Sequence, residues 1–296
     1  MISIAMATYN GAKYIKEQID SILNQTIQDF ELVVCDDCSA DNTFKILQEY
    51  AQIDSRFHVY LNKNNLGFKK NFEKAISLCK GEYIALSDQD DIWMDNHLEL
   101  LLKAIKGKQM ACGNSIFIDQ HGKPLGMTLK YQEALDYIPK DDLKKSMAIF
   151  LFRNPYQGAS MMITKELKDI ALPFPEEPYH DVWLASLACF TGGFNYVDKP
   201  LLKYRRLESS VSGIRDQRKS KIEWFTHWHI LNDRKHIISY ILQNKKLHLN
   251  PKQCSFLKKM LRICERDHNR IGFRINQIYK LIHYKTIYNC DWKHWI

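Results

Sequence analysis

The stretch Tyr83-Ile-Ala-Leu-Ser-Asp-Gln-Asp-Asp91 sets the pattern of the first hundred residues. A short apolar run, typical of a buried strand, leads directly into a group of carboxylates. Three similar apolar runs precede it, and a segment with apolar residues at helical spacing follows each of the four. The runs are residues 2–7, 30–35, 57–61 and 83–86, and the helical segments are residues 11–25, 41–53, 67–80 and 95–106. This alternation predicts βαβ units, and therefore an α/β fold with a mostly parallel sheet flanked by helices.

The second half of the chain has a looser pattern, which we expect to complete the sheet and to shape a second substrate site. The predicted elements are strands near 109–118 and 160–163, helices near 141–151 and 181–190, and strands near 193–197 and 200–205. After Gly213 the pattern changes to long helices at about 216–244, 251–270 and 274–288. We therefore predict a catalytic domain of residues 1–213 and a helical extension of residues 214–296.

Charge is distributed unevenly between these two parts. The 296 residues have a formal net charge of +8. Residues 1–213 hold 24 Lys and Arg against 28 Asp and Glu, whereas residues 214–296 hold 18 against 6. A basic surface suits nucleic acid, an anionic membrane or a phosphorylated ligand, so its sign alone selects no partner. With 45% apolar and 26% charged residues, the composition excludes a disordered or fibrous protein.

Three features of the sequence favour a cytoplasmic protein. No apolar run approaches the roughly 18–20 residues that a membrane-spanning helix needs. The N-terminus, Met1-Ile-Ser-Ile4, begins at once as a predicted strand and lacks the basic region of a signal peptide. The eight cysteines are scattered among apolar residues, which suits reduced thiols better than a disulfide framework.

Polar residues gather where the predicted strands end. They are Thr8-Tyr-Asn10 after the first strand, Asp36-Asp37 after the second, and Asp88 to Asp91 after the fourth. Carboxyl ends of parallel strands share one edge of a sheet, where open α/β sheets bind their ligands. We therefore expect one site built from three loops.

The phosphates of a nucleotide at this site would need an unusual partner, because neither G-x-x-x-x-G-K-[ST] nor G-x-G-x-x-G follows the first strand. Asp88 and Asp90 offer one. Alternate side chains of an extended segment face the same way, so both carboxylates can converge on a divalent cation that bridges diphosphate oxygens. The alternative is that the acidic loop serves only as a turn or a helix cap.

Taken together, these motifs resemble those of a known enzyme family. Ile4-Ala-Met-Ala-Thr-Tyr-Asn10, Asp36-Asp-Cys-Ser39 with Asp41-Asn-Thr43, and Tyr83 to Trp93 are similar to the N-terminal half of family 2 glycosyltransferases, which have the GT-A fold. Asn65-Leu-Gly-Phe68 with Asn71-Phe72 is similar to the members that build bacterial surface glycans, many of them rhamnosyltransferases. The resemblance is strong over residues 1–95 and looser over 150–213.

The resemblance implies roles for individual residues in binding a nucleotide sugar. Thr8, Tyr9 and Asn10 would line the nucleotide pocket, Asp37 would accept a hydrogen bond from a pyrimidine N–H, and Asp88 would face the ribose hydroxyls. Asp90, with Asp88, would hold Mg²⁺ or Mn²⁺ against the diphosphate. Lys70 or Lys69 would add positive charge near the phosphates, although an exposed helical lysine is commonly only solvated. Asp36 is expected either to contact the nucleotide or only to shape its turn.

The resemblance also implies an acceptor site around Tyr179-His180-Asp181-Val-Trp183, where a predicted helix begins. An aspartate there is commonly an N-cap, but in this family an acidic residue at such a place is the catalytic base, so Asp181 is our candidate. Trp183 would stack on a sugar unless it is part of the core. His180 would position the acceptor unless it is an ordinary surface histidine.

One departure from the family concerns the third metal ligand. Many similar bacterial members have Tyr-Arg-x-His after the last strand, whereas this chain has Tyr204-Arg-Arg-Leu207. A third protein ligand at this place is therefore in doubt, and we expect Arg205 or Arg206 to neutralise phosphate instead.

The expected reaction is an inverting, metal-dependent sugar transfer in the synthesis of a bacterial surface polysaccharide, such as O-antigen of lipopolysaccharide or capsule. The donor would be dTDP-rhamnose, towards which the surface-glycan resemblance leans, or a UDP-hexose or UDP-N-acetylhexosamine. The acceptor would be a glycan or a lipid-linked glycan. The alternatives are a catalytically inactive scaffold and a basic nucleic-acid-binding protein, and the second is disfavoured because no recognition motif accompanies the basic helices.

The basic extension then has two interpretations. Its Lys and Arg residues, with Trp224, Phe225 and Trp228, would rest on the anionic inner face of the cell membrane, where a lipid-linked acceptor is presented. Otherwise they form a solvated helical bundle or an oligomer interface.

Overall fold

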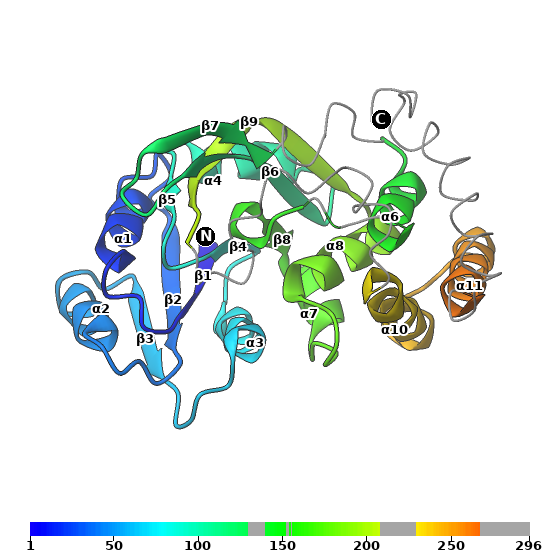
Figure 1. Cartoon of the computed structure of the whole chain (residues 1–296), viewed down its shortest axis with the longest axis horizontal. Helices are drawn as coiled ribbons and strands as arrows, with labels where there is room; N and C mark the ends of the chain where they lie inside the picture. Colours follow the sequence, from blue (N-terminus) through cyan, green and yellow to red (C-terminus); the bar gives the residue numbers. More distant parts are fainter. Residues whose placement is uncertain (130–139, 152–153, 155, 208–228, 267–296) are drawn as a thin grey trace.

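A mixed β-sheet with helices on both faces forms the body of the protein (Figure 1). The computed structural model describes residues 1–129, 140–151, 154, 156–207 and 229–266. Within them the sheet has nine strands in the order β3-β2-β1-β4-β8-β6-β9-β5, and β7 pairs with β6 beside this path.

The first half of the chain forms the parallel part of the sheet. The strands are β1 (Ile2–Thr8), β2 (Phe30–Asp36), β3 (Phe57–Leu61) and β4 (Tyr83–Ser87). The helices are α1 (Ile15–Leu23), α2 (Thr43–Ile53), α3 (Phe68–Leu78) and α4 (His97–Ala104). β1 is central, with β2 on one side and β4 on the other, both parallel to it. All eight elements confirm the alternation predicted from the sequence.

The rest of the sheet mixes both directions, because β8 is antiparallel to β4 and β6, β5 to β9 and β7 to β6, whereas β6 and β9 are parallel. Its strands are β5 (Ile92–Trp93), β6 (Met110–Ile118), β7 (Pro124–Thr128), β8 (Met162–Thr164) and β9 (Phe194–Arg205), and a 3-10 turn, η1 (Gly158–Ser160), precedes β8. The prediction of two strands at 193–197 and 200–205 was wrong, because β9 runs without a break beside β6. Pro200, which has no N–H to donate, lies opposite Asn114, where the register shifts. That irregularity lets the strand continue through a proline.

Alternation along the strands creates two hydrophobic cores. On β1, Ile4 and Met6 face the core under α1, α2 and α4, whereas Ala5 faces the opposite core under α3. All three side chains are buried. Helices therefore cover both faces of the sheet, and the loops after the parallel strands lie at its carboxyl edge.

The remaining helices lie on the α3 side of the sheet. They are α6 (Asp142–Leu151), α7 (Lys165–Ala171), α8 (His180–Thr191), α10 (His229–Gln243) and α11 (Pro251–Arg266). Ile237 and Ile241 of α10 and Leu257 and Met260 of α11 are buried in the same cluster as α8. The described part of the predicted extension therefore shares the core of the α/β part. The predicted helix at 274–288, the first part of the helix at 216–244, and Trp224, Phe225 and Trp228 lie outside the described residues.

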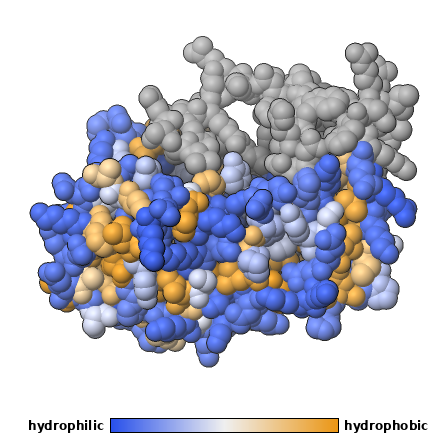
Figure 2. Space-filling model, turned by 90° about the horizontal axis from the view of Figure 1, so that it is seen from below, coloured by the Kyte–Doolittle hydropathy of each residue, from blue (hydrophilic) through white to orange (hydrophobic). Residues whose placement is uncertain are grey.

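The described surface is mainly hydrophilic on the face shown in Figure 2, where apolar residues form separate patches. Among the described helices, none combines the length and the apolar character that crossing a membrane requires.

Candidate functional site

The acidic loop after β4 is the most strongly perturbed group of charges near the sheet edge. Asp88 and Asp90 are half-buried, and Asp91 is buried. Burial, followed by the negative charges of Asp90 and Asp181, raises the pKa of Asp88 to about 7. Burial also raises the pKa of Asp90 to about 6, against the opposing effects of its own backbone N–H and of Arg205. The pKa of Asp91 lies well above its ordinary range through burial and the charges of Asp90 and Asp88.

This loop suits a divalent cation. No described residue donates a hydrogen bond to the carboxylate of Asp88, and only its own backbone donates to that of Asp90. Among the described residues no group of three or more His, Cys, Asp and Glu side chains is placed to hold a metal. Two carboxylates are nevertheless an ordinary protein contribution to Mg²⁺ binding, since substrate phosphates and water complete the coordination. The donor set therefore fits the Mg²⁺ or Mn²⁺ that we expected.

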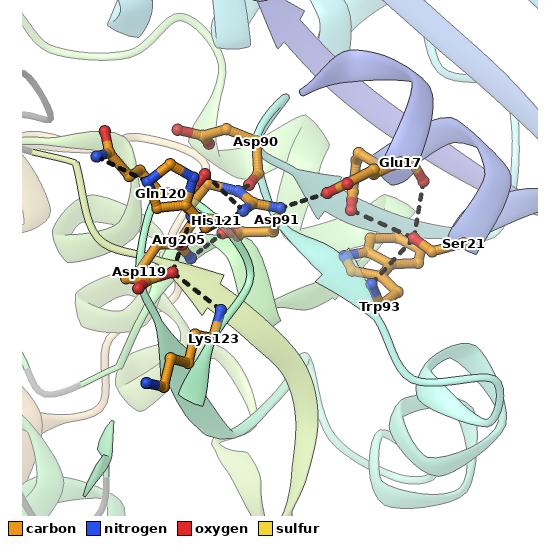
Figure 3. Close-up of polar contacts among 11 residues, drawn as sticks. Glu17, Ser21, Asp90, Asp91, Trp93, Asp119, Gln120, His121, Lys123 and Arg205 are labelled. Carbon is orange, nitrogen blue, oxygen red and sulfur yellow. Dashed lines mark hydrogen bonds and ion pairs between the residues drawn. The ribbon is translucent and has the colours of Figure 1, made fainter. Parts of the chain in front are cut away.

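Arg205, at the end of β9, holds this loop in place (Figure 3). Its backbone N–H donates to Asp91 Oδ1 (2.9 Å), and its Nε donates to the backbone carbonyl of Asp90 (2.8 Å). The rest of the guanidinium bonds Glu17 Oε2 on α1 (2.5 Å) and the carbonyl oxygens of Asp119 and Gln120 (3.3 and 3.4 Å).

These contacts change the role that we expected for Arg205. The residue is 2% exposed, and all three guanidinium nitrogens have protein partners. A buried guanidinium satisfied in this way positions the carboxylate loop and is not available to a phosphate. Its partners are up to 188 positions away in the sequence, so no local pattern could have indicated the arrangement.

The loop after β1 is tied to the acidic loop through Gln89. The backbone N–H of Tyr9 donates to Gln89 Oε1 (2.8 Å), and Gln89 Nε2 donates to the carbonyl of Tyr9 (3.0 Å). A Cβ on Gly11 would lie 2.3 Å from Gln89 Oε1, so any larger residue here would displace the Gln89 side chain from this position. Sequence analysis did not identify Gln89, because its function is a contact with a main chain 80 residues away.

The other predicted residues of the first loop have well-defined places. Thr8 is buried and donates its hydroxyl to Asp36 Oδ2 (2.9 Å). Asn10 adopts a φ of 48°, which asparagine tolerates, and its Oδ1 accepts from the N–H of Ala40 (2.8 Å). Tyr9 is 49% exposed, so its ring remains accessible to a ligand.

The two aspartates after β2 differ in their contacts. Asp36 is fully buried and accepts from Thr8 and from Ser39, so it shapes the turn. Asp37 accepts hydrogen bonds from Asn62 Nδ2 (2.7 Å) and from the N–H groups of Leu66 and Gly67 (2.8 Å each). Asp37 is also 2% exposed and already has three donors, so the hydrogen bond that we expect from a pyrimidine stays a prediction.

Lys70 does not reach the carboxylates of the acidic loop. Its ammonium pairs with Glu73 of the same helix at 2.7 Å, and its side chain is 44% exposed. These contacts match the exposed helical lysine that we considered, and a role of Lys70 near the phosphates stays a prediction.

Asp181 lies in the first turn of α8 and is half-buried. Its Oδ1 accepts from the N–H of Val182 (2.7 Å). The charge of Asp181 is one of the effects that raise the pKa of Asp88, and the role of Asp181 as the base stays a prediction.

The neighbours of Asp181 differ from expectation. Trp183 is 3% exposed and donates its indole N–H to the carbonyl of Ala171 (3.1 Å), so it belongs to the core and cannot stack on a sugar. His180 is also buried and stacks on Phe72, with ring centroids 4.4 Å apart. Burial lowers the pKa of His180. His180 is therefore part of the core beside Phe72 and is not a surface histidine.

Polar loops follow β1, β2 and β4 at the carboxyl edge of a helix-covered sheet, and those after β2 and β4 carry clustered carboxylates, as in ligand sites of open α/β sheets. The chain matches the model of glycosyl transferase family 2 over residues 3–167. It is 30% identical over 249 residues to an uncharacterized glycosyltransferase of Methanocaldococcus jannaschii, covering 81% of this chain and 83% of that protein. It is 28% identical over 234 residues to the "Putative teichuronic acid biosynthesis glycosyltransferase TuaG" of Bacillus subtilis, covering 77% and 87%.

The fold agrees with these matches. The structure of S. aureus TarS 1–349 superposes with a TM-score of 0.61 at 20% identity, covering 97% of this chain and 80% of that one. The protein belongs to glycosyl transferase family 2. It is a glycosyltransferase, and its α/β sheet confirms the predicted GT-A fold.

Proposed function

We propose that this glycosyltransferase moves a sugar from a nucleotide diphosphate sugar to a hydroxyl of a glycan or lipid-linked glycan during surface-polysaccharide synthesis. The observation that carries the proposal is the pair of carboxylates at the carboxyl end of β4, Asp88 and Asp90, which no described side chain binds, together with Asp181 at the start of α8. Asp181 suits an acceptor hydroxyl as a base, and the carboxylate pair suits a diphosphate neutralised by a cation.

The relatives support the same class of substrate. Beside the teichuronic acid protein, E. coli chondroitin synthase is 38% identical over 113 residues, which is 38% of this chain and 16% of that protein. TarS was solved with UDP and with UDP-GlcNAc. A Pyrobaculum calidifontis mannosyltransferase of 14% identity was solved with GDP-Man and Mn²⁺. We favour a pyrimidine nucleotide, bound through Asp37, with a UDP-hexose, a UDP-N-acetylhexosamine or dTDP-rhamnose as the donor.

The proposed mechanism uses the side chains of Asp181, Asp88 and Asp90. Asp181 takes the proton of the acceptor hydroxyl, and that oxygen attacks the anomeric carbon from the face opposite the nucleotide. A new carbon–oxygen bond forms as the bond to the diphosphate breaks, so the anomeric configuration inverts. The N-terminal end of α8 favours the negative charge of the Asp181 carboxylate. Asp88 and Asp90 would hold the divalent cation, which supplies positive charge for the leaving diphosphate.

The base is tested by replacing Asp181 with Asn in a direct transfer assay, with the donor found by screening nucleotide sugars for hydrolysis. A positioned base contributes about 10²–10⁴ in rate, so Asp181→Asn should lower kcat by at least that order while the Kd for the donor stays near the wild-type value. The exposed Asp169 on α7 provides a matched control, Asp169→Asn. Wild-type kcat in Asp181→Asn would exclude this base.

The described part of the extension supports a second proposal, contact with an anionic membrane. On α11, Lys252, Lys258, Lys259 and Arg262 are exposed, whereas Leu257 and Met260 of the same helix are buried. One face is therefore basic and the other is fixed to the core. Each basic residue near an anionic surface contributes about 1 kcal/mol.

Sedimentation with phosphatidylglycerol-containing vesicles tests this second proposal. We expect binding at low salt that is lost at high salt, and weaker binding by Lys258→Gln/Lys259→Gln. Absence of binding at low salt would leave a solvated face or an oligomer interface, which light scattering distinguishes.

A further inference from the structure

Two aromatic rings beside the candidate base contact each other at the surface. Phe68 is 42% exposed and Tyr179 is 53% exposed, and their ring centroids are 5.5 Å apart with an interplanar angle of 44°. Single exposed apolar residues are common, but exposed aromatic residues in mutual contact at a site mark a binding surface. The pair has no role in the reaction described so far.

Both rings are held by rigid parts of the fold. Phe68 is the first residue of α3, and the preceding N–H groups of Leu66 and Gly67 are fixed by the carboxylate of Asp37. Tyr179 is the N-cap residue of α8.

Buried aromatic residues support the pair from beneath. The ring of His180 lies edge-on to that of Phe68, at a centroid distance of 6.3 Å, and stacks on the buried Phe72 at 4.4 Å. The exposed pair is therefore the outer layer of an aromatic stack that reaches the core.

The position of the pair relative to Asp181 indicates its ligand. Tyr179 is two residues before Asp181 at the start of the same helix, so a molecule lying on its ring is close to the candidate base. The charges of Glu176 and Glu177 act on the ammonium group of Lys69, the residue after Phe68. One face of a pyranose ring presents C–H groups, which suit the negative face of an aromatic ring, while its hydroxyls suit charged neighbours.

We propose that Phe68 and Tyr179 form a stacking platform for a sugar ring of the acceptor, with Lys69 and Glu176 as partners for its hydroxyls. The proposal rests on the proposed function, because it takes Asp181 as the base. It assigns to Tyr179 the stacking role that we had expected of Trp183, whose indole points into the core.

Kinetics with the methyl glycoside that accepts sugar from the active donor test the platform. Tyr179→Ala and Phe68→Ala should each raise the KM for the acceptor by roughly three- to tenfold, while Tyr179→Phe stays near the wild type. In both alanine variants the change in the KM for the acceptor should exceed any change in donor hydrolysis without acceptor. Tyr60, an aromatic residue 38% exposed on β3, gives the control Tyr60→Ala. A wild-type KM for the acceptor in both alanine variants would overturn the platform and leave the proposed function intact.

Saturation-transfer NMR separates the platform from catalysis. Methyl glycosides of glucose, galactose and N-acetylglucosamine should receive saturation from the wild-type protein on their C–H protons, and much less from Tyr179→Ala. Equal signals from the two proteins would refute stacking on this ring. If no nucleotide sugar is hydrolysed, the proposed function fails, and a signal that depends on Tyr179 would still support a sugar-binding surface.

Discussion

Replacing Arg205 with Met should destabilise the protein far more than replacing its ion-pair partner, Glu17, with Gln. Arg205→Met removes the hydrogen bonds to the backbone of Asp90 and to two carbonyl oxygens, and it leaves Asp90 and Asp91 without their positive neighbour. Loss of one partner from a buried charge cluster costs about 3–5 kcal/mol. Glu17→Gln keeps the buried guanidinium beside these carboxylates.

The difference between the two variants follows from exposure. The side chain of Glu17 is 59% exposed and that of Arg205 is 1% exposed. Solvent therefore screens the ion pair, and removal of the Glu17 charge should cost about 1 kcal/mol or less. For a chain of this size, 1 kcal/mol corresponds to about 2–4 °C in Tm. Arg205→Met should thus lower Tm by about 6–20 °C, and Glu17→Gln by about 4 °C at most.

Thermal unfolding followed by circular dichroism at pH 7 measures both effects. Titration of Mn²⁺ into each variant, followed by electron paramagnetic resonance, reports whether the displaced loop also loses affinity for the cation. Equal losses of Tm in Arg205→Met and Glu17→Gln, or a loss below about 2 °C in Arg205→Met, would refute the view that the buried guanidinium holds the loop.

Three further outcomes are expected. The pKa of Asp88 is raised in the folded state to about 7 from 3.8, so the metal-free protein should lose stability as pH rises from about 4 to 7. Asp88→Asn should reduce this dependence of stability on pH and raise Tm at pH 8 in EDTA. An unchanged pH dependence in Asp88→Asn would contradict the raised pKa of Asp88. Trp183→Phe leaves the carbonyl of Ala171 without its donor and should cost about 1–3 kcal/mol in urea unfolding, while the KM for the acceptor stays constant; a large rise in that KM would return Trp183 to the sugar site. Gly11→Ala should displace the side chain of Gln89 and raise the KM for the donor, and Gln89→Ala should reproduce that rise.

The parallel half of the fold was predictable because its signals are local. The apolar stripe of a helix such as α1, with Ile15, Ile19 and Ile22 all buried, is written in consecutive turns of one segment. The carboxylates at the end of β4 were predictable for the same reason, since strand ends of a parallel sheet meet at one edge.

The remaining features depend on contacts between distant segments. Arg205 is the last residue of β9, and its local sequence suggests an exposed cation. In the folded protein Glu17, Asp119 and Gln120 accept hydrogen bonds from its guanidinium. On α8 nearly every side chain is buried, so the sequence gives no amphipathic stripe from which to tell that Trp183 points inward. The ring of Tyr240 on α10 and the carbonyl of Ala171 on α7 determine its orientation.

We expect α10 and α11 to unfold together with the α/β part, because they share its buried core. Phe256 of α11 contacts Phe190 of α8, and Lys246 Nζ, just after α10, donates to the carbonyl of Leu172 (2.8 Å). A protein shortened to the predicted catalytic domain would expose the apolar side of α8, the helix that carries Asp181 in its first turn. The C-terminal helices are therefore part of the scaffold that supports α8 and the candidate base at its start, and an extension grafted onto this α/β half would have to match its buried face.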